Sequence, residues 1–183
     1  SVCVMLTWRT KMFRRCRLDV NVLSRCTAAM ILHLFAAAAY AQIERPLDPI
    51  AAGLQPTRIL TYKQVDNVGL RMHVFEPEGH LATDRRAVFM IFHGGGWTGG
   101  NPRRCFPFAD YFQQHGMVSI SVEYRILKRN GTSTVFDCVK DGRSAVRYLR
   151  QHASELGIAP QKIIVAGCSA GGHVAAGTAL FSG

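Results

Sequence analysis

The stretch GCSAG at residues 167–171 lies between an apolar, strand-like run at residues 162–166 and a helix-like run at residues 172–180. A serine between two glycines at such a junction is typical of a nucleophile held on a sharp turn. Glycine is needed on either side because only a residue without Cβ lets the strand and the helix approach so closely. Ser169 is therefore the candidate catalytic nucleophile.

A second glycine-rich stretch, HGGGW at residues 93–97, directly follows the apolar run at residues 87–92. Backbone N–H groups in such a turn are not covered by side chains and can stabilise the oxyanion of an acyl-transfer transition state. The residue after the nucleophile, Ala170, supplies a further donor in sites of this kind. A phosphate-binding loop is the alternative, but the glycines lack the G-x-G-x-x-G spacing and no Lys-Ser/Thr pair follows them.

Strand-like and helix-like runs alternate along the rest of the chain, which predicts an α/β fold with a parallel sheet and right-handed crossovers. About five strands and three helices are expected. The expected strands are residues 58–65, 70–75, 87–92, 117–124 and 162–166, with a turn at 66–69; the expected helices are residues 101–115, 133–156 and 172–180.

Together these motifs make the chain resemble the bacterial esterase/lipase branch of the α/β-hydrolase superfamily, the hormone-sensitive-lipase-like and acetyl-esterase-like carboxylesterases. The matching stretches are HGGGW at 93–97, VEYRI at 122–126 and AGCSAGGH at 166–173, within a resemblance that covers residues 58–183. The resemblance implies that Ser169 is the nucleophile and that the N–H groups of Gly95, Gly96 and Ala170 form the oxyanion hole, with Gly94 a less favoured third donor.

The catalytic acid and histidine of such hydrolases follow the serine in chain order. Ser169 lies fourteen residues before the last residue of the sequence. We therefore expect the acid and the base beyond residue 183, and interpret residues 57–183 as the N-terminal part of an α/β-hydrolase domain. Its later strands would be missing, and it would be inactive alone.

The histidines and aspartates that are present fit other roles. We expect His93 to brace the glycine turn by hydrogen bonding, and the ring of His173 to point away from the serine because only four residues separate the two. Asp137 and Asp141 precede the serine on the expected helix 133–156 and are interpreted as surface or capping groups.

The predicted function is that of a serine carboxylesterase acting on short-chain or carbohydrate-linked esters through an acyl-enzyme on Ser169. A serine peptidase of the same fold and a non-catalytic binding protein on a hydrolase scaffold are the alternatives. No cofactor is expected, and no metal, because no cysteine or histidine spacing matches a zinc site.

The N-terminal residues 1–41 have the pattern of residues before a start codon followed by a secretory signal peptide. Met12 is the candidate start, residues 28–39 are apolar, and the A-x-A-like sequence at 39–41 is a candidate cleavage site. We expect an exported protein, periplasmic or extracellular, with no stable membrane association after cleavage. An uncleaved anchor is the alternative. Residues 42–56, which contain three prolines, are expected to form an extended leader.

The chain has a net charge of +10, and six basic residues but one acidic residue lie before residue 42. The remaining basic residues are scattered along the chain. A nucleic-acid-binding surface more often clusters them with aromatic side chains in between, so we expect a small-molecule or carbohydrate-linked ester as the partner and no nucleic acid.

Three cysteines follow the predicted signal: Cys105, Cys138 and Cys168. Export would place them where disulfides persist, and a Cys105–Cys138 bridge is left open because sequence alone does not fix connectivity. Cys168 is expected to be a small buried residue at the end of a strand.

Overall fold

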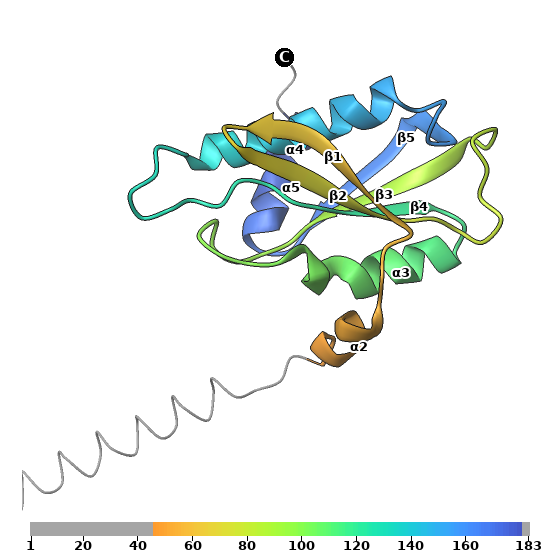
Figure 1. The fold of residues 1–183 in the computed structure, drawn as a ribbon, viewed down its shortest axis with the longest axis horizontal. Coiled ribbons are helices and arrows are strands. Elements are labelled where there is room, and N and C mark those ends of the chain that lie inside the picture. The colour runs from red at the N-terminus through yellow and green to blue at the C-terminus, as the bar shows by residue number, and fades with distance from the viewer. Residues whose placement is uncertain (1–45, 181–183) are drawn as a thin grey trace, which may run out of the picture. The chain divides into compact units, whose positions relative to one another are not determined.

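The computed structural model describes residues 46–180 (Figure 1). The chain separates into two units, residues 1–44 and 45–183, and the described residues belong to the second. The predicted pre-start residues and signal peptide, which together make up residues 1–41, therefore lie outside the described residues. None of the helices between residues 46 and 180 has the length and apolar character needed to cross a bilayer.

Five strands form one mixed sheet in the order β1-β2-β4-β3-β5. Strand β3 is parallel to both β4 and β5, whereas β2 is antiparallel to β1 and to β4. The prediction of an α/β fold with about five strands is confirmed. The expectation of a parallel sheet is wrong for its β1–β2–β4 part, because the β1–β2 hairpin joins β4 through an antiparallel pairing. The strands are β1 (Arg58–Val65), β2 (Val68–Phe75), β3 (Arg86–Phe92), β4 (Val118–Val122) and β5 (Ile158–Gly167).

Helices cover both faces of the sheet (Figure 1). Helix α3 (Phe106–Gln114) packs on one face, preceded by a short 3₁₀ turn, η1 (Pro102–Cys105). On the other face lie α4 (Val135–Gln151) and α5 (Ala170–Leu180), which also contact each other. A six-residue helix, α2 (Asp48–Gly53), contacts η1 and α3.

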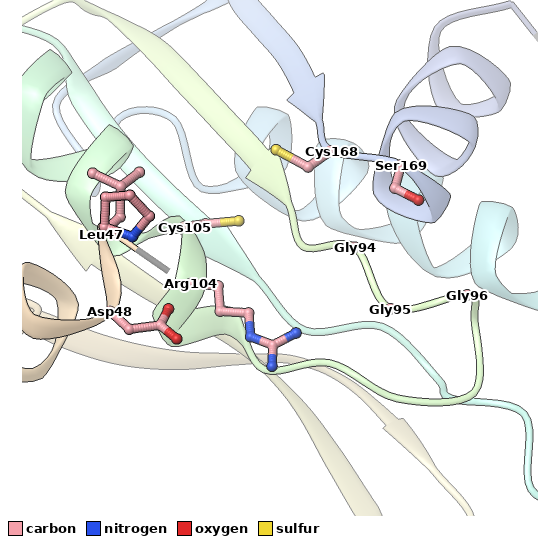
Figure 2. Close-up of a pocket in the computed structure, with 10 residues that line it drawn as sticks. Leu47, Asp48, Gly94, Gly95, Gly96, Arg104, Cys105, Cys168 and Ser169 are labelled. Atoms are coloured by element: carbon pink, nitrogen blue, oxygen red, sulfur yellow. The ribbon is translucent and has the colours of Figure 1, made fainter. Parts of the chain in front are cut away.

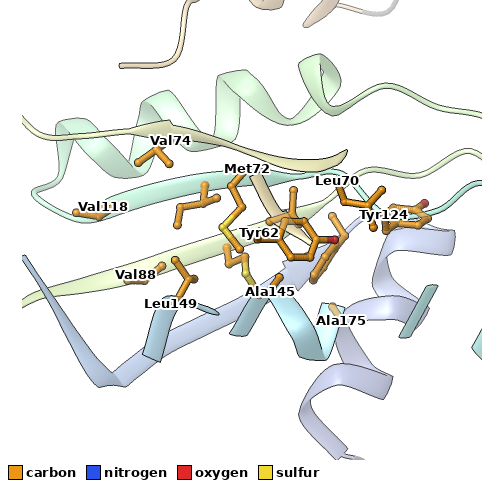
Figure 3. Packing of buried hydrophobic residues seen from close by; sticks show 14 of the residues in the cluster. Tyr62, Leu70, Met72, Val74, Val88, Val118, Tyr124, Ala145, Leu149 and Ala175 are labelled. Atoms are coloured by element: carbon orange, nitrogen blue, oxygen red, sulfur yellow. The ribbon is translucent and has the colours of Figure 1, made fainter. Parts of the chain in front are cut away.

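The core lies mainly between the sheet and the α4–α5 layer (Figure 3). Alternate side chains of β3 point to opposite faces of the sheet. Val88, Met90 and Phe92 pack in this cluster, on the α4–α5 side. Phe89 and Ile91 face the α3 side, where they pack in a smaller cluster with Cys105. Burial on both faces explains why β3 is an uninterrupted apolar run in the sequence.

Two predicted segments differ from the structure. The leader expected to be extended contains helix α2: Pro49 and Asp48 in the first turn favour a helix start, and Ala51 is buried. The helix expected at residues 133–156 ends at Gln151, and a turn carries the chain to β5. Ala153 and Leu156 are nevertheless buried in the core, so their apolar spacing reflects tertiary packing rather than a continuing helix.

Other boundaries also shift, among them the ends of β4 and the start of α5. The β1–β2 turn is Asp66 and Asn67 rather than four residues. Strand β5 begins at Ile158 instead of residue 162, with an irregular register against β3. The helix expected at residues 101–115 divides into η1 and α3.

Helix α4 starts with a capping box that makes a pH-dependent contribution to stability. Asp137 accepts hydrogen bonds from the backbone N–H and the hydroxyl of Thr134, both 2.9 Å long. These bonds lower the pKa of Asp137 from its usual 3.8 to about 2. The stabilisation is therefore complete above about pH 4 and is lost as the pH falls from there towards 2.

We expect Asp137→Asn to have a shallower decrease in melting temperature than the wild type between pH 5 and pH 2. Thermal unfolding at half-unit pH steps measures this, with Asp110→Asn as the control for a half-buried carboxylate on another helix. Equal slopes for the wild type and Asp137→Asn would contradict the assignment.

Candidate active site

Ser169 lies at the junction between β5 and α5, as the sequence predicts. Its φ of +51° is in the left-handed region, which is strained for a residue with a side chain. A Cβ on Gly171 would lie 2.2 Å from the carbonyl oxygen of Phe92, and one on Gly167 would lie 2.2 Å from that of Gly171. The two flanking glycines therefore allow the turn to lie directly against the end of β3.

The glycine loop after β3 also has backbone angles that residues with a side chain rarely adopt. Gly95 and Gly96 have φ angles of +139° and +61°, and a Cβ on Gly95 would lie 2.2 Å from the carbonyl oxygen of Gly99. Gly94 lies very close to the nucleophile elbow, the turn at residues 167–171. A Cβ added to Gly94 would lie 2.9 Å from the carbonyl oxygen of Cys168. Glycine is thus needed both for the conformation of the loop and for its contact with the nucleophile turn.

The backbone donors expected of an oxyanion hole are available. The N–H groups of Gly94, Gly95, Gly96 and Ala170 have no hydrogen-bond acceptor among residues 46–180. In Figure 2 the side chain of Ser169 points towards the Gly94–Gly96 loop. The structure therefore brings the predicted nucleophile and the predicted donors together.

His93 braces this loop, which confirms its predicted role. Its Nδ1 bonds to the carbonyl oxygen of Gly94 at 3.0 Å, and its ring stacks on Tyr124 with centroids 4.6 Å apart. The Tyr124 hydroxyl donates to the carbonyl oxygen of His93 at 2.7 Å. Burial lowers the pKa of His93, which keeps the imidazole neutral at physiological pH.

A second link holds the far end of the loop. The carbonyl oxygen of Trp97 accepts a hydrogen bond of 2.7 Å from the N–H of Leu127. The Trp97 ring meets the ring of His173 edge to face, with centroids 5.5 Å apart. His173 is thus packed on Trp97, and it forms no hydrogen bond with the Ser169 hydroxyl.

A pocket of about 480 Å³ opens beside the nucleophile (Figure 2). Its walls come from the glycine loop, the elbow, η1 and the start of α2. The lining residues are Pro46, Leu47, Asp48, Gly94, Gly95, Gly96, Arg104, Cys105, Cys168 and Ser169.

The cysteine predictions are corrected in part. Cys168 is exposed rather than buried, because it lines the open pocket beside Ser169. Cys105 and Cys138 are both free thiols, and they lie in different hydrophobic clusters, on opposite faces of the sheet. No disulfide joins them.

The two aspartates of α4 have different roles. Asp137 is a capping group, as predicted. Asp141 is fully buried, so its interpretation as a surface or capping residue is wrong. Its carboxylate accepts two 2.8 Å bonds from the Arg125 guanidinium and one of 2.7 Å from the Lys63 ammonium. Two cations on neighbouring segments offset the cost of burying this charge.

No imidazole ring among the six histidines between residues 46 and 180 bonds to the Ser169 hydroxyl; the contact of His173 with Ser169 is a backbone hydrogen bond. Four of them bond to backbone carbonyls, His73 pairs with Glu123, and His173 packs on Trp97. Within the same part of the chain no group of three or more His, Cys, Asp or Glu side chains could hold a metal ion.

Sequence reasoning did not find several pocket residues. Leu47 and Asp48 come from the segment that was interpreted as a leader, and Arg104 and Cys105 come from η1. They have no shared motif, and only the packing of α2 and η1 beside the glycine loop brings them to the serine.

Residues 72–183 match the BD-FAE family. The chain belongs to the BD-FAE family. This is a family of α/β-hydrolases similar to hormone-sensitive lipase, and its assignment confirms the resemblance drawn from the motifs.

Individual relatives agree with this assignment. The chain is 37% identical to the AB hydrolase superfamily protein C1039.03 of Schizosaccharomyces pombe over 59% of its length, and 35% identical to the probable carboxylic ester hydrolase LipM of Mycobacterium tuberculosis over 57%. Among solved structures it is similar to esterase 2 of Thermogutta terrifontis, with 45% identity and a TM-score of 0.63 over 65% of the chain.

The matches span less than half of these relatives. They cover 31% of the S. pombe protein, 23% of LipM and 44% of the Thermogutta esterase chain. The chain is therefore an esterase-like α/β-hydrolase by family, with the part of the fold that holds the nucleophile elbow and the glycine loop.

Proposed function

We propose that the chain supplies the nucleophile and the oxyanion hole of a serine carboxylesterase. The observation that carries the proposal is the close approach of the nucleophile turn and the glycine loop. Ser169, held at a φ of +51°, faces a glycine loop whose N–H groups have no acceptor among the described residues, beside a pocket of about 480 Å³.

The proposed chemistry is acyl transfer to Ser169. Its Oγ attacks the ester carbonyl carbon while a base takes the hydroxyl proton, and the carbonyl oxygen becomes an oxyanion held by the N–H groups of Gly95, Gly96 and Ala170. Collapse of this intermediate expels the alcohol and leaves an acyl-enzyme, which water hydrolyses.

The base and its orienting acid are proposed to come from outside residues 46–180. All six histidines in that range are engaged elsewhere, and the matched relatives are more than twice as long as the segment that they share with this chain.

Short-chain or carbohydrate-linked esters are the proposed substrates. The pocket of about 480 Å³ beside Ser169 is in the size range of small-molecule sites. The Thermogutta esterase, 45% identical over the shared segment, has been solved with propionate and with butyrate bound, which supports a preference for short acyl chains. Export of the protein is proposed from the sequence of residues 12–41.

The test is covalent labelling of the full-length protein with a fluorophosphonate probe. We expect one adduct on Ser169, found by peptide mass spectrometry, because the probe needs an activated serine beside an oxyanion hole. The Thermogutta esterase is phosphorylated by paraoxon, which is reactivity of the same kind. Ser154→Ala, a change at an exposed serine outside the pocket, serves as the control and should label normally.

The same preparation distinguishes the alternatives. Turnover of p-nitrophenyl butyrate without cleavage of peptide anilides supports the esterase, and the reverse supports a peptidase. A folded protein that neither labels nor turns over either substrate would show a binding protein instead.

A further inference from the structure

A guanidinium group with no partner among residues 46–180 lies at the pocket that holds Ser169. Arg104 lines this pocket together with Ser169 and the Gly94–Gly96 loop. Its side chain forms no hydrogen bond or ion pair with any residue between 46 and 180. In Figure 2 it extends from η1 into the space between Asp48 and Gly95.

Exposed Arg129 also has no partner among the described residues, but it does not line this pocket, so the position of Arg104 at the serine is what distinguishes its guanidinium. The neighbouring Arg103 donates to the carbonyl oxygen of Ala52 at 3.4 Å and lies over the ring of Phe106 at 5.7 Å. It does not line the pocket of Ser169. The arginines that pair with a carboxylate are Arg58, Arg71, Arg86 and Arg125.

The charge of Arg104 acts on the catalytic region. Burial is the main cause of the lowered pKa of His93, and the positive charge of Arg104 adds to it. Asp48 is the acidic residue among the pocket-lining side chains, and no ion pair within 4.0 Å joins it to Arg104. Among residues 46–180, therefore, no acceptor takes up the guanidinium donors that could bind a group entering the pocket.

We propose that Arg104 selects esters that carry a negatively charged group, such as a carboxylate, close to the scissile bond. This inference rests on the proposed esterase function. A planar guanidinium binds a carboxylate through two parallel, charge-assisted hydrogen bonds, and it stays protonated at every working pH. Asp48 acts in the opposite sense, since its charge repels the same group.

The anionic group can belong to the acyl part or to the alcohol part of the ester, and two substrate pairs separate these cases. Mono-p-nitrophenyl succinate against p-nitrophenyl butyrate tests a carboxylate on the acyl part. 4-Acetoxybenzoate against phenyl acetate tests one on the alcohol part. For each pair the measured quantity is the ratio of kcat/KM for the charged ester to that for the neutral ester.

We expect Arg104→Gln to lower this ratio about tenfold in one of the pairs, which is the size of one partly exposed charge-assisted interaction. Asp48→Asn should raise the ratio in the same pair. Arg103→Gln is the matched control, because it removes the same charge from the adjacent position outside the pocket, and it should leave the ratio unchanged.

Raising NaCl from 0.05 M to 0.5 M should lower the wild-type ratio, which tests the inference without any variant. Equal ratios for Arg104→Gln and the wild type in both pairs, or equal losses for Arg103→Gln and Arg104→Gln, would overturn the selection by Arg104 alone. Wild-type protein that hydrolyses none of the four esters would overturn the proposed function, and this inference with it.

Discussion

Ser169→Ala should lower the kcat of the full-length protein for p-nitrophenyl butyrate by a factor on the order of 10⁶. Loss of a catalytic serine in an acyl-transfer site has an effect of about this size, because the remaining histidine and oxyanion donors have no nucleophile to activate. The residual rate reflects binding and the oxyanion hole alone. Steady-state kinetics measures the loss, with circular dichroism confirming that the variant is folded.

Ser169→Gly extends the same prediction to stability. It should be as inactive as the alanine variant but more stable than it by about 1 kcal/mol, because glycine adopts a φ of +51° without the strain that a Cβ causes. Chemical denaturation of the two variants compares them directly. A glycine variant that is less stable than the alanine variant would show that Ser169 is not strained.

Asp141→Ala should cost about 3 kcal/mol of unfolding free energy, at the lower end of the range for a broken buried ion pair. The carboxylate is fully buried, and its loss leaves Arg125 and Lys63 without their shared partner. Both cations are partly exposed and regain some hydration, which is why the upper end of the range is not expected. A decrease in melting temperature of roughly 6–12 °C follows for a chain of this size.

The matched control for this variant is Asp137→Ala, one helical turn earlier on α4. It removes a capping carboxylate, a change that costs about 1 kcal/mol. Urea denaturation of both variants gives the comparison. If the two variants lose the same stability, the buried carboxylate of Asp141 is no more important than a helix cap.

Local sequence was enough to predict the nucleophile, the glycine loop and the strands that position them. The reason is that these features depend on backbone geometry. Ser169 and Gly95 need φ angles and close approaches that only their glycine-rich surroundings allow, and such requirements appear directly in the sequence as G-x-S-x-G and HGGG. An uninterrupted apolar run likewise identifies β3 as a strand covered on both faces.

Only the tertiary structure decided the features that depend on which segments meet. Asp141 looks like a surface residue until β1 and the segment after β4 bring Lys63 and Arg125 to it. Arg104 and Asp48 are ordinary charged residues until η1 and α2 pack beside the glycine loop. Local spacing encodes strand, turn and helix, whereas the partner of a charged side chain is set by contacts between residues far apart in the chain. The sequence by itself therefore determined the nucleophile turn and the loop that faces it, and the packing of distant segments decided the surroundings of the pocket.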